Sequence, residues 1–185
     1  ASDTGTPGDG VTSDTTVNVG GLEPGATWEY STDGGTSWNT GSGTSFELDP
    51  NASYADGDIV VRQTDLAGNT GAEGALVGAV ETDTTQPGTI DAALENDTGT
   101  PGDGITSDPT VLVDTADLDP DATWEYSTDG GTTWHPGTGT SFDLTPGTSY
   151  PADAVQVRQV DAQGNPVDPP KLGPIVIDTA APAAP

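Results

Sequence analysis

Two stretches of the chain are nearly identical and carry its clearest structural signal: Ala26-Thr-Trp-Glu-Tyr-Ser-Thr-Asp-Gly-Gly-Thr-Ser-Trp38 and Ala122-Thr-Trp-Glu-Tyr-Ser-Thr-Asp-Gly-Gly-Thr-Thr-Trp134. In each stretch aromatic residues alternate with polar ones, which is typical of a strand with one buried face. The Asp-Gly-Gly that follows is a strong signal for a tight turn between antiparallel strands. We therefore expect a β-hairpin in each stretch, with its first tryptophan in a hydrophobic core.

The rest of the sequence repeats at the same interval. Asp83-Thr matches Asp178-Thr, and Tyr54 matches Tyr150, so the repeat is about 95 residues long. That length fits a small sandwich domain and is too long for a solenoid repeat. The other alternating runs are short and separated by turn residues, and none has helical periodicity. Each tyrosine precedes the penultimate strand, where a tyrosine corner is expected. The sequence predicts an all-β fold of two tandem Ig-like β-sandwich domains joined by a short linker, over residues 1–86 and 87–185.

The two repeats differ at their beginnings. Residues 88–95 should form the first strand of the second repeat, whereas the first strand of the first repeat is truncated, because the sequence starts at Ala1. The sequence closes on Asp178-Thr-Ala-Ala-Pro, which matches the Asp83-Thr-Thr-Gln-Pro between the repeats. We therefore expect a further repeat to follow in a longer protein.

The chain is strongly acidic, with 30 Asp and Glu against 3 Lys and Arg and a formal net charge of -27. Nucleic acids and anionic membrane surfaces bind proteins through Lys and Arg, so neither is an expected partner. No apolar run is long enough to span a bilayer, so membrane insertion is not expected. The chain has no cysteine. Because disulfides are excluded, bound metal is the usual way to stabilise a small extracellular domain.

Each repeat carries an acidic loop, Asp-Thr-Gly-Thr-Pro-Gly-Asp-Gly-Val/Ile-Thr-Ser-Asp, at residues 3–14 and 97–108. Carboxylates and carbonyls on an irregular loop are the oxygen ligands that calcium takes. In an Ig-like sandwich this loop lies at the pole where the last strand leaves, so we expect it to meet Asp83 or Asp178. The alternative is that these aspartates form turns on a solvated surface. The candidate metal ligands in the loops are Asp3, Asp9, Asp14, Asp97, Asp103 and Asp108.

The turns Asp65-Leu-Ala-Gly-Asn and Asp161-Ala-Gln-Gly-Asn, with the acidic loops and the Asp-Thr-x-x-Pro linkers, give the chain a family resemblance. It resembles the tandem bacterial Ig-like extender repeats of large type I-secreted adhesins, including RTX-type and biofilm-associated adhesins. The resemblance covers the whole chain and implies Ca2+ bound within and between domains. Gln163 and Pro166 depart from the family pattern and are expected to alter the second turn. Carried over by position, the resemblance adds as metal ligands Asp65, Asp83, Asp161 and Asp178.

Two hypotheses about function follow. The first is a calcium-binding structural spacer of a bacterial cell-surface adhesin: an extracellular monomer whose partners are neighbouring repeats of the same chain. The second is a ligand-binding adhesin module that recognises carbohydrate or protein through exposed Trp38 and Trp134. No enzyme is expected. Both hairpins match the Asp-box pattern S-x-D-x-G-x-x-W of sialidase-type propellers, which is a structural turn, and the single histidine, His135, belongs to no catalytic motif.

Overall fold

The computed structural model describes residues 2–184. The chain forms two compact units, Ala1–Thr85 (unit 1) and Gln86–Pro185 (unit 2), divided one residue before the predicted boundary. The regular secondary structure of the described residues consists of β-strands, which confirms the predicted all-β class. Over this range no helix has the length and apolar character needed to cross a membrane.

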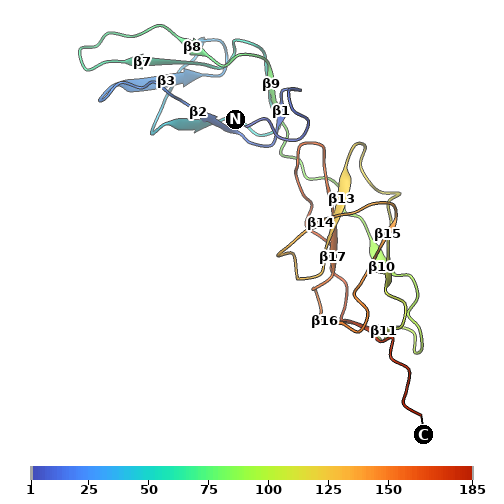
Figure 1. Ribbon diagram of the computed structural model, residues 1–185. Coiled ribbons are helices and arrows are strands. Elements are labelled where there is room, and N and C mark those ends of the chain that lie inside the picture. Colours follow the sequence, from blue (N-terminus) through green and yellow to red (C-terminus); the bar gives the residue numbers. More distant parts are fainter. Residues whose placement is uncertain (1, 185) are drawn as a thin grey trace. The chain divides into compact units, whose positions relative to one another are not determined.

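Unit 2 is a β-sandwich in which β13 and β17 lie side by side (Figure 1). Its hydrogen-bonded sheets have the orders β10-β12-β15, β14-β13-β17 and β11-β18-β16. The core collects buried side chains from all three sheets, among them Val111, Trp124, Val157 and Ile177. The strands are β10 (Ala92–Leu94), β11 (Ile105–Thr106), β12 (Thr110–Val113), β13 (Thr123–Ser127), β14 (His135–Pro136), β15 (Ser141–Asp143), β16 (Ser149–Tyr150), β17 (Gln156–Val160) and β18 (Ile175–Ile177).

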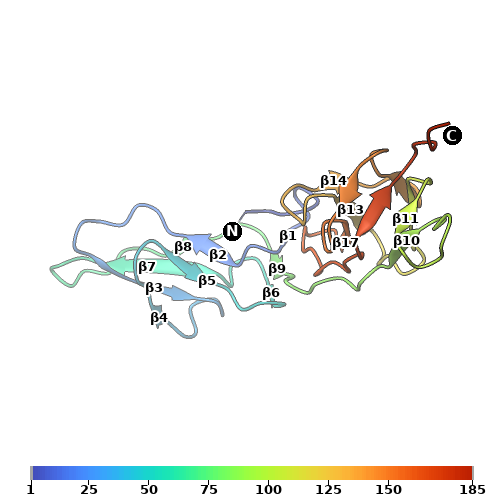
Figure 2. The ribbon, with the colours of Figure 1, turned by 90° about the horizontal axis from the view of Figure 1, so that it is seen from below.

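Unit 1 repeats this arrangement with two differences within residues 2–85: β2 pairs with β5 alone, and β8 adds a fourth strand beside β7. Its sheets have the orders β2-β5, β4-β3-β7-β8 and β1-β9-β6, and Figure 2 shows β3 and β7 running together. Val17, Trp28, Phe46 and Tyr54 are among its buried core residues. The strands are β1 (Val11–Thr12), β2 (Thr16–Asn18), β3 (Thr27–Ser31), β4 (Asn39–Thr40), β5 (Ser45–Glu47), β6 (Ser53–Tyr54), β7 (Val60–Thr64), β8 (Gly74–Ala75) and β9 (Val80–Thr82).

The tyrosine corners are confirmed, because the Tyr54 hydroxyl accepts a hydrogen bond from Asp49 N at 3.0 Å and the Tyr150 hydroxyl accepts one from Thr145 N at 2.9 Å. The run of residues 75–82, which leads to the linker, does not form one continuous strand. Its beginning, in β8, pairs with β7, while its end, β9, pairs with β1 and β6. The chain therefore passes from one sheet to another within this run.

The first tryptophan of each hairpin is buried as predicted: Trp28 is 5% exposed and Trp124 is 4% exposed. Gly137 lies against the Trp124 ring, and a Cβ added to this glycine would stand 2.1 Å from a ring carbon. Gly41 makes the same contact with Trp28, where the added Cβ would stand 2.2 Å from the ring. The hairpin can close over the indole only because these positions lack a side chain.

We predict that Gly137→Ala destabilises unit 2 by about 1–3 kcal/mol, because the added methyl group overpacks the Trp124 ring. Gly173→Ala is the control, since a Cβ there would meet nothing within 4 Å, and it should change stability by less than about 0.5 kcal/mol. Amide hydrogen exchange of unit 2 in increasing urea measures the free energy of unfolding of both variants. Equal effects of the two substitutions would contradict the role given to the ring contact.

Candidate metal-binding loops

The aspartates of each acidic loop form hydrogen bonds to the loop's own backbone. In unit 2, Asp97 Oδ2 accepts a bond from Gly102 N at 2.5 Å. Asp103 Oδ1 and Asp108 Oδ1 each accept one from the amide two residues ahead, at 2.9 and 3.1 Å. These bonds are typical of Asp-rich turns. Unit 1 has the equivalent bonds, which Asp3, Asp9 and Asp14 accept from Gly8, Val11 and Thr16.

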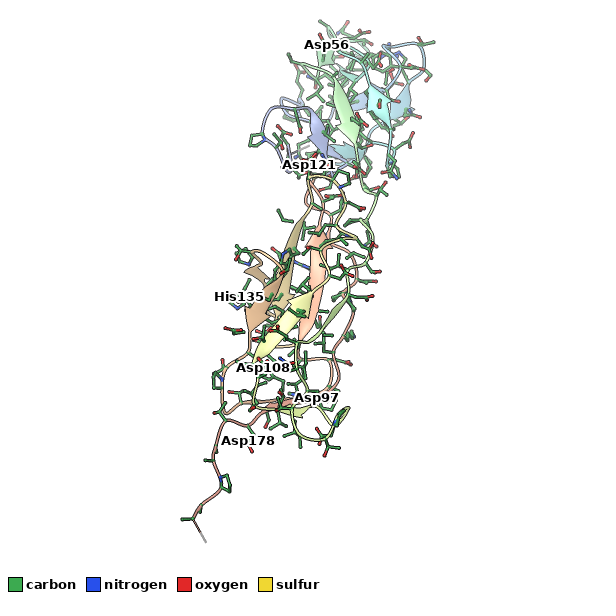
Figure 3. The ribbon with its side chains drawn as sticks, turned by 90° about the vertical axis from the view of Figure 1, so that its right-hand side faces the viewer. Asp56, Asp97, Asp108, Asp121, His135 and Asp178 are labelled. Atoms are coloured by element: carbon green, nitrogen blue, oxygen red, sulfur yellow. The ribbon has the colours of Figure 1, made fainter. Side chains whose placement is uncertain are left out.

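A parallel strand pair holds each loop against the last strand of its unit. In unit 2, β11 pairs with β18, and Asp178 N donates to Thr106 O at 2.8 Å. In unit 1, Asp83 N donates to Thr12 O at 2.9 Å. Figure 3 shows Asp97, Asp108 and Asp178 at the same end of unit 2. The expectation that each loop and its linker aspartate share one pole is confirmed for the backbone.

The carboxylates at this pole do not converge on one point. Within residues 2–184, no group of three or more Asp, Glu or His side chains is arranged to hold a metal ion. One oxygen is nevertheless unusual, because Asp97 Oδ1 is buried and has no hydrogen-bond partner. Leaving a buried carboxylate oxygen unpartnered costs free energy, and a bound cation would recover that cost. The donor chemistry at Asp97 therefore fits a hard cation such as calcium.

Two further loop carboxylates are kept ionised by their hydrogen bonds. Ser2 N donates to Asp14 Oδ2 at 2.9 Å, and this bond, with that from Thr16, lowers the pKa of Asp14 to about 2. Asn96 Nδ2 donates to Asp108 Oδ2 at 2.6 Å and is the main cause that lowers the pKa of Asp108. Each loop therefore ends on a fixed negative charge.

Asp65 and Asp161 form the turns that follow β7 and β17. Asp161 Oδ1 accepts bonds from Gln163 N at 2.9 Å and Asn165 N at 2.7 Å, and Oδ2 accepts one from Asn165 Nδ2 at 2.8 Å. Asp65 has the same set, and its pKa is lowered mainly by the asparagine side chain of its turn. The expectation that Gln163 and Pro166 alter the second turn is wrong, because both turns supply the same two backbone N–H groups and the same asparagine side chain.

Trp38 and Trp134 are half-buried, so the expectation that they are exposed needs correction. The Arg62 guanidinium carbon lies 3.8 Å from the Trp38 ring centre, and that of Arg158 lies 3.9 Å from the Trp134 ring centre. Each arginine also pairs with a glutamate of the adjacent strand, at 2.8 Å. Because the hairpin folds the indole back over its neighbouring strand, one ring face is already occupied by a cation.

The Asp-box hairpins have the predicted turn. Ser31 Oγ donates to Asp33 Oδ1 at 2.7 Å, Ser37 N donates to the same oxygen at 2.8 Å, and Ser37 Oγ donates to Oδ2 at 2.6 Å. The bonds from Ser37 are the main cause that lowers the pKa of Asp33 to about 2. Asp129 accepts the equivalent bonds in unit 2, and its pKa is also about 2.

These hairpins should lose stability in acid. The pKa values of Asp33 and Asp129 in the folded chain, about 2, lie below the ordinary 3.8. Their contribution is therefore complete above about pH 4 and is lost as the pH falls through about 2. Thermal unfolding of the wild type and of an Asp33→Asn/Asp129→Asn variant tests this. The variant should start from a lower Tm at neutral pH and show a smaller decrease in acid. Parallel decreases in the two proteins would show that other groups cause the acid effect.

Comparison with known proteins assigns no family to the chain, since no family model and no curated protein matches it. Among solved structures, the chain is similar to the fibronectin(III)-like modules of Clostridium thermocellum CbhA. The identity is 13% and the TM-score 0.48, and the match covers 91% of this chain and 87% of that chain. A likeness at this level assigns no function. The resemblance to adhesin extender repeats stays a prediction.

Proposed function

We propose that the chain is a calcium-binding spacer of a bacterial cell-surface adhesin, in which calcium stiffens tandem β-sandwich units. The observation that carries this proposal is Asp97 Oδ1, a buried carboxylate oxygen without a hydrogen-bond partner. It belongs to the loop that β11 holds against β18, where Asp178 follows the last strand. Asp97, Asp178 and the carbonyls of a Gly-rich loop are the ligand types that calcium binds.

The charge of the chain supports a cationic ligand. With 3 Lys and Arg against 30 Asp and Glu, the chain has few basic side chains to neutralise its carboxylates. Repulsion among like charges destabilises the compact state. A cation that binds only the folded chain adds stability by mass action, about 2.7 kcal/mol at a hundred times its dissociation constant.

In this proposal the partners are neighbouring repeats of the same chain, and the protein is an extracellular monomer without catalytic activity. His135 is exposed and lies beside Tyr126, with ring centres 5.4 Å apart, a position that implies no chemistry. Ligand binding through Trp38 and Trp134 is less favoured, since an arginine already covers each indole.

Calcium should raise the Tm of the chain relative to a chelated sample, and Asp97→Asn should remove most of the increase. Asp121→Asn is the matched control, because it removes the same charge from the opposite end of unit 2 (Figure 3). Asp121 has φ +64, which asparagine tolerates, so this variant should respond to calcium as the wild type does. Identical melting of the calcium-loaded and chelated wild type would overturn the proposal, as would an unchanged response in Asp97→Asn.

A further inference from the structure

Five Asp-Gly pairs occur in the chain, and two of them lie in the acidic loops. In an Asp-Gly pair the glycine nitrogen can attack the carboxyl carbon of the aspartate, because glycine has no side chain to obstruct the approach. The structure separates the five pairs by how firmly it holds these two groups. The pairs in the loops are Asp9-Gly10 and Asp103-Gly104, and the others are Asp33-Gly34, Asp56-Gly57 and Asp129-Gly130.

The attacking nitrogen is without a bond in the acidic loops and hydrogen-bonded in the hairpins. In unit 2, the Gly104 N–H donates to no atom of residues 2–184, whereas Gly130 N donates to Ala154 O at 3.0 Å. Unit 1 repeats the contrast: within the same described range the Gly10 N–H has no acceptor, and Gly34 N donates to a backbone oxygen at 2.9 Å. Attack by a hairpin nitrogen would therefore first have to break a hydrogen bond.

The carboxyl groups show the same contrast. Among the described residues, the Asp103 carboxylate accepts one hydrogen bond, from Ile105 N at 2.9 Å. This Asx turn folds the carboxyl group back over the peptide bond that follows Asp103. In the hairpin, Asp129 instead accepts three bonds, from Ser127 Oγ and from the N and Oγ1 of Thr133. The carboxyl group of the loop is thus the less restrained of the two.

Two further differences slow the pairs outside the acidic loops. The reactive form of aspartate is the neutral carboxyl group, from which the hydroxyl leaves as water. The hydrogen bonds described above lower the pKa of Asp33 and of Asp129 to about 2, so little of either group is neutral at neutral pH. Asp56 Oδ1 accepts a bond from Gly78 N at 2.9 Å, which ties this carboxyl group to another segment and not to its own turn.

The fold requires glycine at both loop positions. Gly104 has φ +72, and a Cβ added to it would stand 2.4 Å from Pro174 O. Gly10 has φ +79, and its added Cβ would stand 2.8 Å from Ala79 O. A larger residue would strain the backbone and collide with the residue that precedes the last strand. The reactive pair is therefore built into each acidic loop.

We propose that Asp103-Gly104 and Asp9-Gly10 are sites of spontaneous isoaspartate formation. The Gly104 nitrogen attacks Cγ of the neutral Asp103 carboxyl group, an N–Cγ bond forms, and the hydrogen of the nitrogen leaves with the carboxyl hydroxyl as water. The product is a succinimide ring. Water, which reaches the exposed Asp103, then adds to one of the two ring carbonyls. Opening at Cγ restores aspartate, whereas opening at the backbone carbonyl leaves Gly104 joined through the side chain, as isoaspartate.

Isoaspartate at this position lengthens the backbone by one carbon atom just before β11. Gly104 O accepts a hydrogen bond from Val176 N at 2.8 Å, and Thr106 O accepts one from Asp178 N at 2.8 Å. These bonds join the acidic loop to β18, and an inserted backbone atom changes the register in which they form. We therefore expect isomerisation to loosen the β11–β18 pair, with faster exchange of the Val176 amide.

The test incubates the 185-residue chain at neutral pH in water enriched in heavy oxygen, with a chelator present throughout. Hydrolysis of a succinimide inserts a heavy oxygen atom, which peptide mapping assigns to a residue, and isoaspartyl methyltransferase measures the isoaspartate formed. Label in the acidic loops should exceed that in the hairpins at least about tenfold, because breaking a hydrogen bond to a charged group slows a reaction by that factor or more. The chelator makes the result independent of the proposed calcium site.

Unfolding supplies the matched control for the whole set. In concentrated urea the five pairs keep their sequence and lose the hydrogen bonds of the fold, so their labelling rates should converge. Thr133→Val removes the hydroxyl bond to Asp129 Oδ2 and should raise labelling at Asp129 in the folded chain. Asp103→Ser keeps a side-chain oxygen for the turn but has no carboxyl carbon. It should abolish labelling at that position and keep the Val176 amide protected during the incubation.

Two results would rule out these sites. One is equal labelling of loops and hairpins in the folded chain, or none in the loops while the unfolded chain is labelled. The other is a difference between loops and hairpins that persists unchanged in urea, since the fold would then not be its cause. Unchanged Val176 exchange in chains that carry isoaspartate at position 103 would contradict the expected loosening of the strand pair.

Discussion

In each unit the core is assembled around one indole ring packed against a glycine and two aromatic rings. Trp124 lies 6.2 Å from Phe142 and 6.3 Å from Tyr126 between ring centres, and Gly137 touches the ring directly. Only 31% of the residues are hydrophobic, so one large buried ring contributes much of the area that holds the sheets together. The hairpin closes on this contact, and the sheets of the unit pack around it.

This small core must withstand strong electrostatic repulsion. Many of the aspartates are also structural, because those at turns accept hydrogen bonds from backbone N–H groups and thereby fix the loops. Asp33, Asp97 and Asp161 are examples. A charged group that is also a turn former cannot be neutralised by protonation without weakening the turn. In the proposed function, a bound cation would reduce the repulsion and leave these bonds in place.

The two units bury equivalent residues to different extents. Their hairpins are nearly identical in sequence and geometry, yet Val157 and Gln159 are fully buried while Val61 and Gln63 are not. In unit 2 the residues that lead into β10 contribute to this burial, because Ile90 is fully buried and Gln159 Nε2 donates to Gly88 O. Val167 is also buried there, where unit 1 has a glycine.

The sequence by itself determined the all-β class, the hairpins with their Asp-box turns, and the burial of Trp28 and Trp124, because these depend on alternation and turn chemistry among near neighbours. Only the tertiary structure decided features that depend on distant residues. Trp38 is half-buried because Arg62 of another strand covers it, and the run over 75–82 divides because its ends pair with different sheets. That each acidic loop lies at the same pole as its linker aspartate was predicted from the sequence, because it depends only on the order of strands in the sandwich. The orientation of each carboxylate could not be predicted in this way, because backbone N–H groups of the same loop donate to its oxygens.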